Sequence, residues 1–251
     1  SRQVNLIHAH ARIPAWIGTY VAKRFRIPIV TTYHWTFVSG FPWNMVTRPG
    51  DWTIAVSHDI KEYVVREFGF DRDRITVIPN GIDCIEFRPR LPSEIDALRK
   101  VFGLTEIDRP TVVYASRMNS DLSDVACKVI EAAALLTHIY PNLCLLIAGD
   151  GECIGRVQQV ANATNNRVGR NMVRVLGFVS DMAALYQASD LTVGMSRVVL
   201  EAMACEKASI VAGPQGNWGL VTPDKVSELY VRNFTSRDAP RPLSPADLLA
   251  D

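Results

Sequence analysis

The chain has 251 residues, of which 48% are hydrophobic and 21% charged, so it can bury one large core or two modest ones. Its 27 Lys and Arg residues nearly balance 26 Asp and Glu residues, which leaves a formal net charge of +1. This balance excludes a global basic field of the kind that binds nucleic acid or anionic membranes. The five cysteines have no CxxC spacing and mostly lie in apolar runs, which suits a reducing cytosol.

Short β-branched runs alternate with longer helical patterns, which is typical of βαβ units with a parallel sheet. The pattern predicts strands at residues 4–9, 27–33, 51–57, 75–80, 111–117, 144–150, 173–179, 190–195 and 208–213. It predicts helices near residues 13–25, 58–68, 122–138, 152–164, 181–188 and 197–206. No stretch approaches the roughly 18 to 20 uninterrupted apolar residues that a membrane-spanning helix needs.

A charged, Pro-containing stretch at residues 84–109 interrupts this pattern before a new strand begins. We therefore expect a partial Rossmann-like domain at 1–90, a linker at 91–109, a second Rossmann-like domain at 110–226 and a polar tail at 227–251. The start reads as a chain entered part-way through a domain, and the Pro-rich tail as loosely packed or truncated. The predicted fold class is α/β, with two parallel sheets and an incomplete N-terminal domain.

The most informative segment, residues 188–213, reads as a strand, a sharp turn, a helix and a second strand. The turn ends at Ser196 and leaves the first backbone N–H groups of the helix without a partner inside the helix. These groups belong to Arg197, Val198 and Val199. Because a helix N-terminus favours negative charge, we expect a diphosphate to bind here.

Glu201 follows about one turn further along the same helix. Its carboxylate can accept hydrogen bonds from two ribose hydroxyls there. A plain amphipathic helix with Glu201 as a solvated charge explains the same pattern, and on periodicity alone we favour that simpler interpretation. A resemblance to a known family reverses this preference.

The helix and the strand after it, LEAMACEKASIVA at 200–212, are similar to the LEAMACGKPVVA signature of family-4 retaining glycosyltransferases. VIPNGID at 77–83 resembles the family's segment that closes the first domain, and IAVSHDIKEYV at 54–64 resembles its IAVSxxxxxxL helix start. VNLIHAHARIPAWIG at 4–18 is similar to its acceptor-side strand and loop, and IPIVTTYHWTF at 27–37 to its T-x-H element. LLIAGDGE and VRVLGFVSDMAALYQASDL resemble the middle of its second domain.

The resemblance implies a GT-B fold, in which two Rossmann-like domains with parallel sheets face a cleft. The first domain would lie on the acceptor side and the second would bind a nucleotide-sugar donor. The implied reaction is transfer of a sugar to a glycan, lipid or small-molecule acceptor with retention, without a metal ion or other cofactor. The implied setting is cell-envelope polysaccharide biosynthesis in the cytoplasm, with a membrane-peripheral position as an alternative and no nucleic-acid partner. Members of the family carry further segments at both ends, so we expect this chain to be trimmed.

Arg117 matches the family's arginine that neutralises the donor diphosphate, which suits a guanidinium because it is always charged and can bind phosphate oxygens in pairs. His34 matches the histidine of the T-x-H element, whose imidazole lies near the transferred sugar. Without the resemblance, the commoner interpretation is a structural histidine at a strand end whose ring nitrogens are hydrogen-bonded within the protein. Taking side chains to alternate along the strand, we expect only one of His8 and His10 to face the ligand. We favour His10, which is nearer the carboxyl end of the strand.

Gly177 and Phe178, in the similar segment VRVLGFVSD, complete the expected donor-binding residues. Three positions depart from the family's pattern. Leu122 stands where the family usually has a lysine, and Val193 where it often has the first of two glutamates. The pattern GMSRVVLEAM fits subgroups that lack this first glutamate. Glu206 stands at a helix end that normally prefers glycine. The second interpretation is therefore a degenerate module that binds a nucleotide sugar without turnover.

Other enzyme classes are excluded by missing motifs. A dinucleotide-dependent oxidoreductase requires G-x-G-x-x-G between a strand and a helix, and the glycines of IAGDGECIG have a different spacing. The chain has no G-x-S-x-G elbow and no H-E-x-x-H, as the corresponding hydrolases would require. No Asp-x-Asp or His/Cys cluster sits at a predicted strand end, so we expect no metal site.

Overall fold

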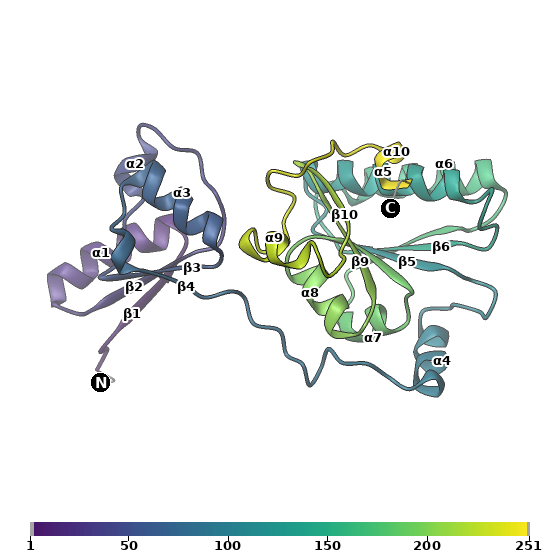
Figure 1. Cartoon of the computed structure of the whole chain (residues 1–251), viewed down its shortest axis with the longest axis horizontal. Helices are drawn as coiled ribbons and strands as arrows, with labels where there is room; N and C mark the ends of the chain where they lie inside the picture. Colours follow the sequence, from purple (N-terminus) through teal and green to yellow (C-terminus); the bar gives the residue numbers. More distant parts are fainter. Residues whose placement is uncertain (1–2, 250–251) are drawn as a thin grey trace. The chain divides into compact units, whose positions relative to one another are not determined.

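The computed structural model describes residues 3–249, which form two compact α/β units (Figure 1). Unit 1 comprises the residues up to Gly81 together with Ser227–Asn233. Unit 2 comprises Ile82–Val226 together with the residues from Phe234 onward. The α/β class and the parallel sheets are confirmed, and the nine predicted strands and six predicted helices all overlap elements of the structure.

The sheet of unit 1 is fully parallel, with the strand order β1-β2-β3-β4. Its strands are β1 (Ile7–His10), β2 (Ile29–Tyr33), β3 (Trp52–Ala55) and β4 (Ile75–Val77). Its helices are α1 (Arg12–Phe25), α2 (Trp43–Val46), α3 (His58–Phe68) and most of α9 (Val226–Val231), with a 3-10 turn at Arg72–Arg74. Its larger core cluster joins β2, β3 and β4 to α3, with Tyr33, Ala55 and Ile75 from the strands and Ile60 from the helix.

Helix α1 lies close against this sheet because its inner face is made of small residues. Ala15, Gly18 and Ala22 are buried on that face. A Cβ atom added at Gly18 would lie 2.9 Å from Ile29 Cδ1, so a larger residue there would require the Ile29 side chain to shift.

The sheet of unit 2 has the strand order β10-β9-β8-β5-β6-β7 and is parallel except for β10, which runs antiparallel to β9. Its strands are β5 (Thr111–Ala115), β6 (Cys144–Ala148), β7 (Val173–Gly177), β8 (Leu191–Gly194), β9 (Ala208–Gly213) and β10 (Gly216–Leu220). Its helices are α4 (Pro92–Val101), α5 (Ser120–Leu136), α6 (Ile154–Val168), α7 (Met182–Gln187), α8 (Arg197–Ala204) and α10 (Pro245–Leu249). Helices α5, α6 and α10 cover one face of the sheet, and α4, α7 and α8 the other (Figure 1).

The stretch predicted as a linker, residues 91–109, belongs to unit 2, and the unit boundary lies at Gly81 rather than at residue 90. The stretch contains α4, whose Arg99 is 3% exposed. Its guanidinium donates to Thr111 Oγ1 at 3.0 Å and to the Ala188 carbonyl at 3.1 Å. The linker prediction was wrong because this charged, Pro-containing stretch forms a helix whose Arg99 is buried against unit 2.

The predicted loose tail is also wrong for the described residues 227–249, while residues 250 and 251 lie outside them. Phe234 and Ser236 are buried. Trp218 Nε1, on β10, donates to the Arg237 carbonyl at 3.2 Å. Strand β10 itself was not predicted, because its sequence GNWGL lacks the β-branched residues that mark a strand.

The turns that follow β5 and β6 are joined by backbone hydrogen bonds. Ser116 N–H donates to the Ala148 carbonyl at 3.1 Å, and Met118 N–H to the Asp150 carbonyl at 3.0 Å. Gly149 lies between these contacts with a φ of +128°, and a Cβ atom there would lie 1.7 Å from the Ser116 carbonyl oxygen. Only glycine fits this position.

We predict that Gly149→Ala lowers the free energy of unfolding by about 1–3 kcal/mol or more, because alanine there is strained and meets the backbone. The measurement is urea denaturation followed by circular dichroism. The control is Gly155→Ala in α6, where an added Cβ atom has no neighbour within 4 Å. That control should gain up to about 1 kcal/mol from helix propensity. Equal stability of the two variants would contradict the close approach.

Candidate functional site

A pocket of about 580 Å³ opens beside the carboxyl ends of β5, β6 and β7 in unit 2. Strand β5 lies between β6 and β8. The strands that follow β5 are added first on one side of it, as β6 and β7, and then on its other side, as β8 and β9. Open α/β sheets bind ligands at the carboxyl ends of strands, at such a switch in strand order. The position of this pocket therefore fits a ligand site.

The pocket brings together five of the expected donor-binding residues. They are Arg117, Phe178, Arg197, Val198 and Glu201. Arg117 comes from the turn after β5, Phe178 from the turn after β7, and the other three from α8. Residues far apart in the sequence therefore line one concave surface.

Three other expected residues do not line this pocket. Gly177 ends β7 with a φ of +68°, and Val199 is fully buried on the inner side of α8. Ser196 precedes α8, and its N–H donates to the Phe234 carbonyl at 2.7 Å. Ser196 was expected among the donor-binding residues, but its N–H is already accepted by a residue of the C-terminal segment.

The N-terminus of α8 offers fewer free N–H groups than expected. Val198 N–H donates to the Met195 carbonyl at 3.2 Å. Within the described part of the chain, the N–H groups of Arg197 and Val199 have no backbone acceptor. A Cβ atom at Gly194 would lie 2.5 Å from Val198 Cγ1, so this glycine allows α8 to start directly at the end of β8.

Glu201 is 7% exposed and forms an ion pair with Arg197, whose Nη2 lies 2.7 Å from Glu201 Oε1. Burial raises the pKa of the Glu201 carboxyl, while Arg197 and the Tyr186 hydroxyl oppose the rise. The simpler interpretation of Glu201 as a solvated charge is therefore wrong. One carboxylate oxygen is held by Arg197, which is itself exposed.

Arg117 is exposed and, among the residues that the structure describes, has no ion-pair partner. Arg117 and Arg197 are the cationic residues that line the pocket. Leu122 lies in the first turn of α5 and does not line it, and Leu122 N–H donates to Asn119 Oδ1 at 3.0 Å. Two guanidinium groups in one pocket are suited to bind a diphosphate.

The expected catalytic histidines lie in unit 1, at the carboxyl ends of β1 and β2. His10 Nδ1 lies 2.9 Å from His34 Nε2. The His8 ring lies 4.3 Å from the His10 ring, and His8 Nε2 lies 2.7 Å from Thr32 Oγ1. The expectation that only one of His8 and His10 faces the ligand side is wrong, because residues two apart in a strand share a face. Burial and the two neighbouring imidazoles lower the pKa of His34.

The residue-based prediction missed three polar or special positions that line the pocket. Glu86 lies in the stretch that was read as an interruption, and Tyr186 is a buried residue inside an apolar helix. Gly149 was recognised only as part of a strand-to-helix turn. The glycine-rich sequence around it, AGDG, was the one available signal that this turn lines a pocket.

No group of three or more His, Cys, Asp or Glu side chains in residues 3–249 is arranged to hold a metal ion. No helix in the same range has the length and apolar character needed to cross a bilayer.

Known proteins resemble both units. A family model described as Glycosyltransferase Family 4 matches residues 1–86, and one described as Glycosyl transferases group 1 matches residues 109–235. The putative glycosyltransferase EpsD of Bacillus subtilis is 28% identical over 236 residues, covering 86% of this chain and 60% of that protein. The UDP-Gal:alpha-D-GlcNAc-diphosphoundecaprenol alpha-1,3-galactosyltransferase of Escherichia coli is 25% identical over 242 residues. This match covers 86% of this chain and 60% of that protein. The crystal structure of Anabaena Alr3699/HepE in complex with UDP-glucose has a TM-score of 0.67 at 23% identity, covering 98% of this chain and 76% of that one.

This chain thus spans 60% of the length of the two curated relatives. The similarity to the solved structure supports a GT-B-like fold with parallel sheets. The group 1 model covers more than half of the residues and includes the strand ends and the helix that line the pocket of unit 2. The chain therefore belongs to the glycosyl transferases group 1 family.

Proposed function

We propose that the protein transfers a sugar from a nucleotide-sugar donor to an acceptor, with retention of configuration and without a metal ion. The observation that carries the proposal is the pocket at the switch point of unit 2, in which Arg117 and Arg197 are the lining cations. The names of two similar proteins support the donor class. The Escherichia coli relative is named for UDP-Gal, and the Anabaena structure contains UDP-glucose.

In this proposal the donor diphosphate lies against Arg117, whose charge has no other partner among the described residues. The backbone N–H groups of Arg197 and Val199 assist at the start of α8. The ribose hydroxyls bind Glu201, which then exchanges or shares its contact with Arg197. Phe178, which is 78% exposed at the pocket, offers an aromatic surface to the donor.

His10 and His34 are proposed to contact the transferred sugar or the acceptor. The lowered pKa of His34 favours a neutral imidazole near pH 7, which can both donate and accept a hydrogen bond. The proposed acceptor is a glycan or a lipid-linked sugar in cell-envelope polysaccharide synthesis, since the Escherichia coli relative is named for a diphosphoundecaprenol acceptor. We place the protein in the cytoplasm, peripheral to a membrane where the acceptor is lipid-linked.

The second candidate is a module that binds the nucleotide sugar without turnover. It is favoured by the absence of a lysine among the described residues that line the pocket, since Leu122 stands where the family usually has one. It is also favoured by the ion pair that occupies one oxygen of Glu201.

A panel of UDP-, GDP- and ADP-sugars tests the proposed function. We expect one donor to raise the melting temperature by preferential binding to the folded state. The same donor should release nucleotide in the presence of acceptor, with or without EDTA. Loss of activity with EDTA and recovery with manganese would overturn metal independence. Binding without nucleotide release would favour the second candidate.

We predict that Arg117→Ala weakens binding of that donor by about 1.5–3 kcal/mol, the scale of a hydrogen bond to a charged group. Isothermal titration calorimetry measures the change. The matched control is Arg167→Ala, which removes an exposed guanidinium of unit 2 that does not line the pocket. Equal affinities of the two variants would remove Arg117 from the donor site.

We predict that Glu201→Gln is as stable as the wild type at acid pH and more stable at neutral pH. The folded state raises the Glu201 pKa above its ordinary value of 4.5, so it disfavours the charged carboxylate. The wild type should therefore lose stability relative to the variant as the pH rises through the folded-state pKa. Melting temperatures of both proteins across this pH range check the sign. A wild type that is the more stable protein at neutral pH would contradict it.

A further inference from the structure

Two acidic side chains from the described part of the chain line the pocket of unit 2. Glu86 is exposed, whereas Glu201 is buried. A carboxylate can accept hydrogen bonds from two ribose hydroxyls only while it is ionised and keeps oxygen lone pairs free. Burial acts against this, because it raises the pKa of the Glu201 carboxyl. Neighbouring groups must therefore hold this carboxylate in its charged form.

Arg197 stabilises the charged form of Glu201, but it also occupies the carboxylate. Its Nη2 lies 2.7 Å from Glu201 Oε1. The Arg197 side chain is 63% exposed and lines the same pocket as Arg117. An anion bound in this pocket would compete with Glu201 for the exposed guanidinium. The contact between Arg197 and Glu201 is therefore the one that a bound diphosphate would weaken.

The hydroxyl of Tyr186 is a second group that holds Glu201. Tyr186 lies in α7, is buried, and lines the pocket. Its hydroxyl hydrogen-bonds the Glu201 carboxyl and lowers the pKa of that group. Burial raises the pKa of Tyr186 itself, so the phenol keeps its proton and acts as the donor. A hydrogen bond donated to the carboxylate favours its ionised form.

The Tyr186 ring is held in place by the core of unit 2. It belongs to the core cluster on the face of the sheet covered by α4, α7 and α8, and its centroid lies 6.2 Å from that of the Phe87 ring. An aromatic ring packed in this way cannot follow an anion into the pocket, whereas the exposed guanidinium of Arg197 can. The Tyr186 hydroxyl is thus the donor that stays with Glu201 when a ligand is bound.

Other charged or titratable groups act on this pair from neighbouring elements. Glu86, in the segment before α4, raises the pKa of Glu201. Cys205, directly after α8, raises the pKa of Tyr186. Arg117 faces the pocket from the turn after β5. Both Glu86 and Cys205 disfavour negative charge nearby, which increases the need for the hydrogen bond from Tyr186.

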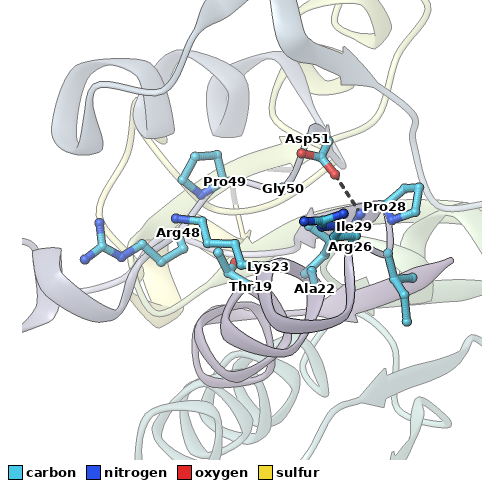
Figure 2. A pocket seen from close by; sticks show the side chains of 11 residues that line it. Thr19, Ala22, Lys23, Arg26, Pro28, Ile29, Arg48, Pro49, Gly50 and Asp51 are labelled. Atoms are coloured by element: carbon cyan, nitrogen blue, oxygen red, sulfur yellow. Dashed lines mark hydrogen bonds between the residues drawn. The ribbon is translucent and has the colours of Figure 1, made fainter.

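A pocket of about 660 Å³ in unit 1 contains a carboxylate that is held differently (Figure 2). Asp51 Oδ2 accepts the Ile29 N–H at 2.9 Å, and the Asp51 N–H donates to the Ile29 carbonyl at 2.8 Å. The backbone of β2 therefore fixes Asp51. Glu201, by contrast, is held by the side chains of Tyr186 and Arg197. A change of one side chain can therefore alter the charge and the orientation of Glu201.

We propose that Tyr186 is a positioning residue of the donor site, which holds the ionised Glu201 carboxylate for the ribose hydroxyls when Arg197 turns to the diphosphate. Tyr186 acts through Glu201 and not by contact with the reacting sugar. The proposal rests on the proposed function, because it requires a nucleoside diphosphate in this pocket. It gives a role in binding to a tyrosine that would otherwise serve only the core.

Two ligands that differ only in the ribose test this role. The probes are the tightest-binding of UDP, GDP and ADP and its 2′,3′-dideoxy analogue, measured with the full chain by isothermal titration calorimetry at pH 7. We expect the wild type to bind the unmodified nucleotide about tenfold or more tightly, the scale of one hydrogen bond to a charged group. In Tyr186→Phe this preference should fall about threefold or more, through weaker binding of the unmodified nucleotide.

Tyr114→Phe is the matched control. Tyr114 is a buried tyrosine of unit 2 outside the residues that line the pocket, and its hydroxyl donates to the Leu122 carbonyl at 2.9 Å. Each variant keeps its ring and loses one buried hydroxyl, and melting temperatures verify that both fold. The control should keep the wild-type preference for the unmodified nucleotide. The same preference in the wild type and in Tyr186→Phe would overturn the proposal.

The pH dependence of this preference is a measurement that a purely structural tyrosine would not change. Loss of the Tyr186 hydroxyl removes a hydrogen bond to the charged carboxylate, so the pKa of Glu201 should rise. Because ribose recognition requires the ionised form, the preference disappears as the pH falls through this pKa. In Tyr186→Phe it should disappear at a higher pH than in the wild type, whereas Tyr114→Phe should follow the wild type. Coincident profiles of the wild type and Tyr186→Phe would contradict the role.

Glu201→Gln shows whether Tyr186 acts through Glu201. In that background Tyr186→Phe should change the preference little, because the group through which it acts is gone. An equal effect of Tyr186→Phe with and without Glu201 would reject the positioning role. If none of the three nucleotides binds the wild type, the proposed function fails together with this role. If one binds no better than its dideoxy analogue, the role of Tyr186 fails while the diphosphate site stands.

Discussion

The backbone contact between the turns after β5 and β6 fixes the floor of the pocket of unit 2. Ser116 and Gly149 approach so closely that no side chain fits at position 149. Gly149 N–H also donates to the Gly177 carbonyl at 2.7 Å, which links this contact to the end of β7. Arg117 and Phe178 extend from the linked turns. Their positions therefore depend on backbone geometry that any larger residue at position 149 would disturb.

Local patterns were sufficient to predict most strands and helices, because hydrophobic periodicity is a property of neighbouring residues. They failed where distant residues decide the structure. Arg99 reads as a surface charge until Thr111 and the Ala188 carbonyl surround it. The segment around Arg237 reads as loose until Trp218 donates to its carbonyl.

The same distinction applies to the site. Arg117 and Glu201 could be proposed from the family resemblance together with the strand, turn and helix order around them. The hydrogen bond from the Ser196 N–H to the Phe234 carbonyl could not be predicted in this way. Its acceptor comes from a later segment whose path no local pattern specifies.

Residues 227–233 belong to unit 1, where the Tyr230 ring lies 6.3 Å from the ring of His58. The polypeptide therefore passes between the units three times, after Gly81, after Val226 and after Asn233. A single cut at Gly81 would leave unit 1 without this segment and would leave the segment attached to unit 2. The two units are therefore interleaved along the sequence, and neither can be excised as one continuous stretch of chain.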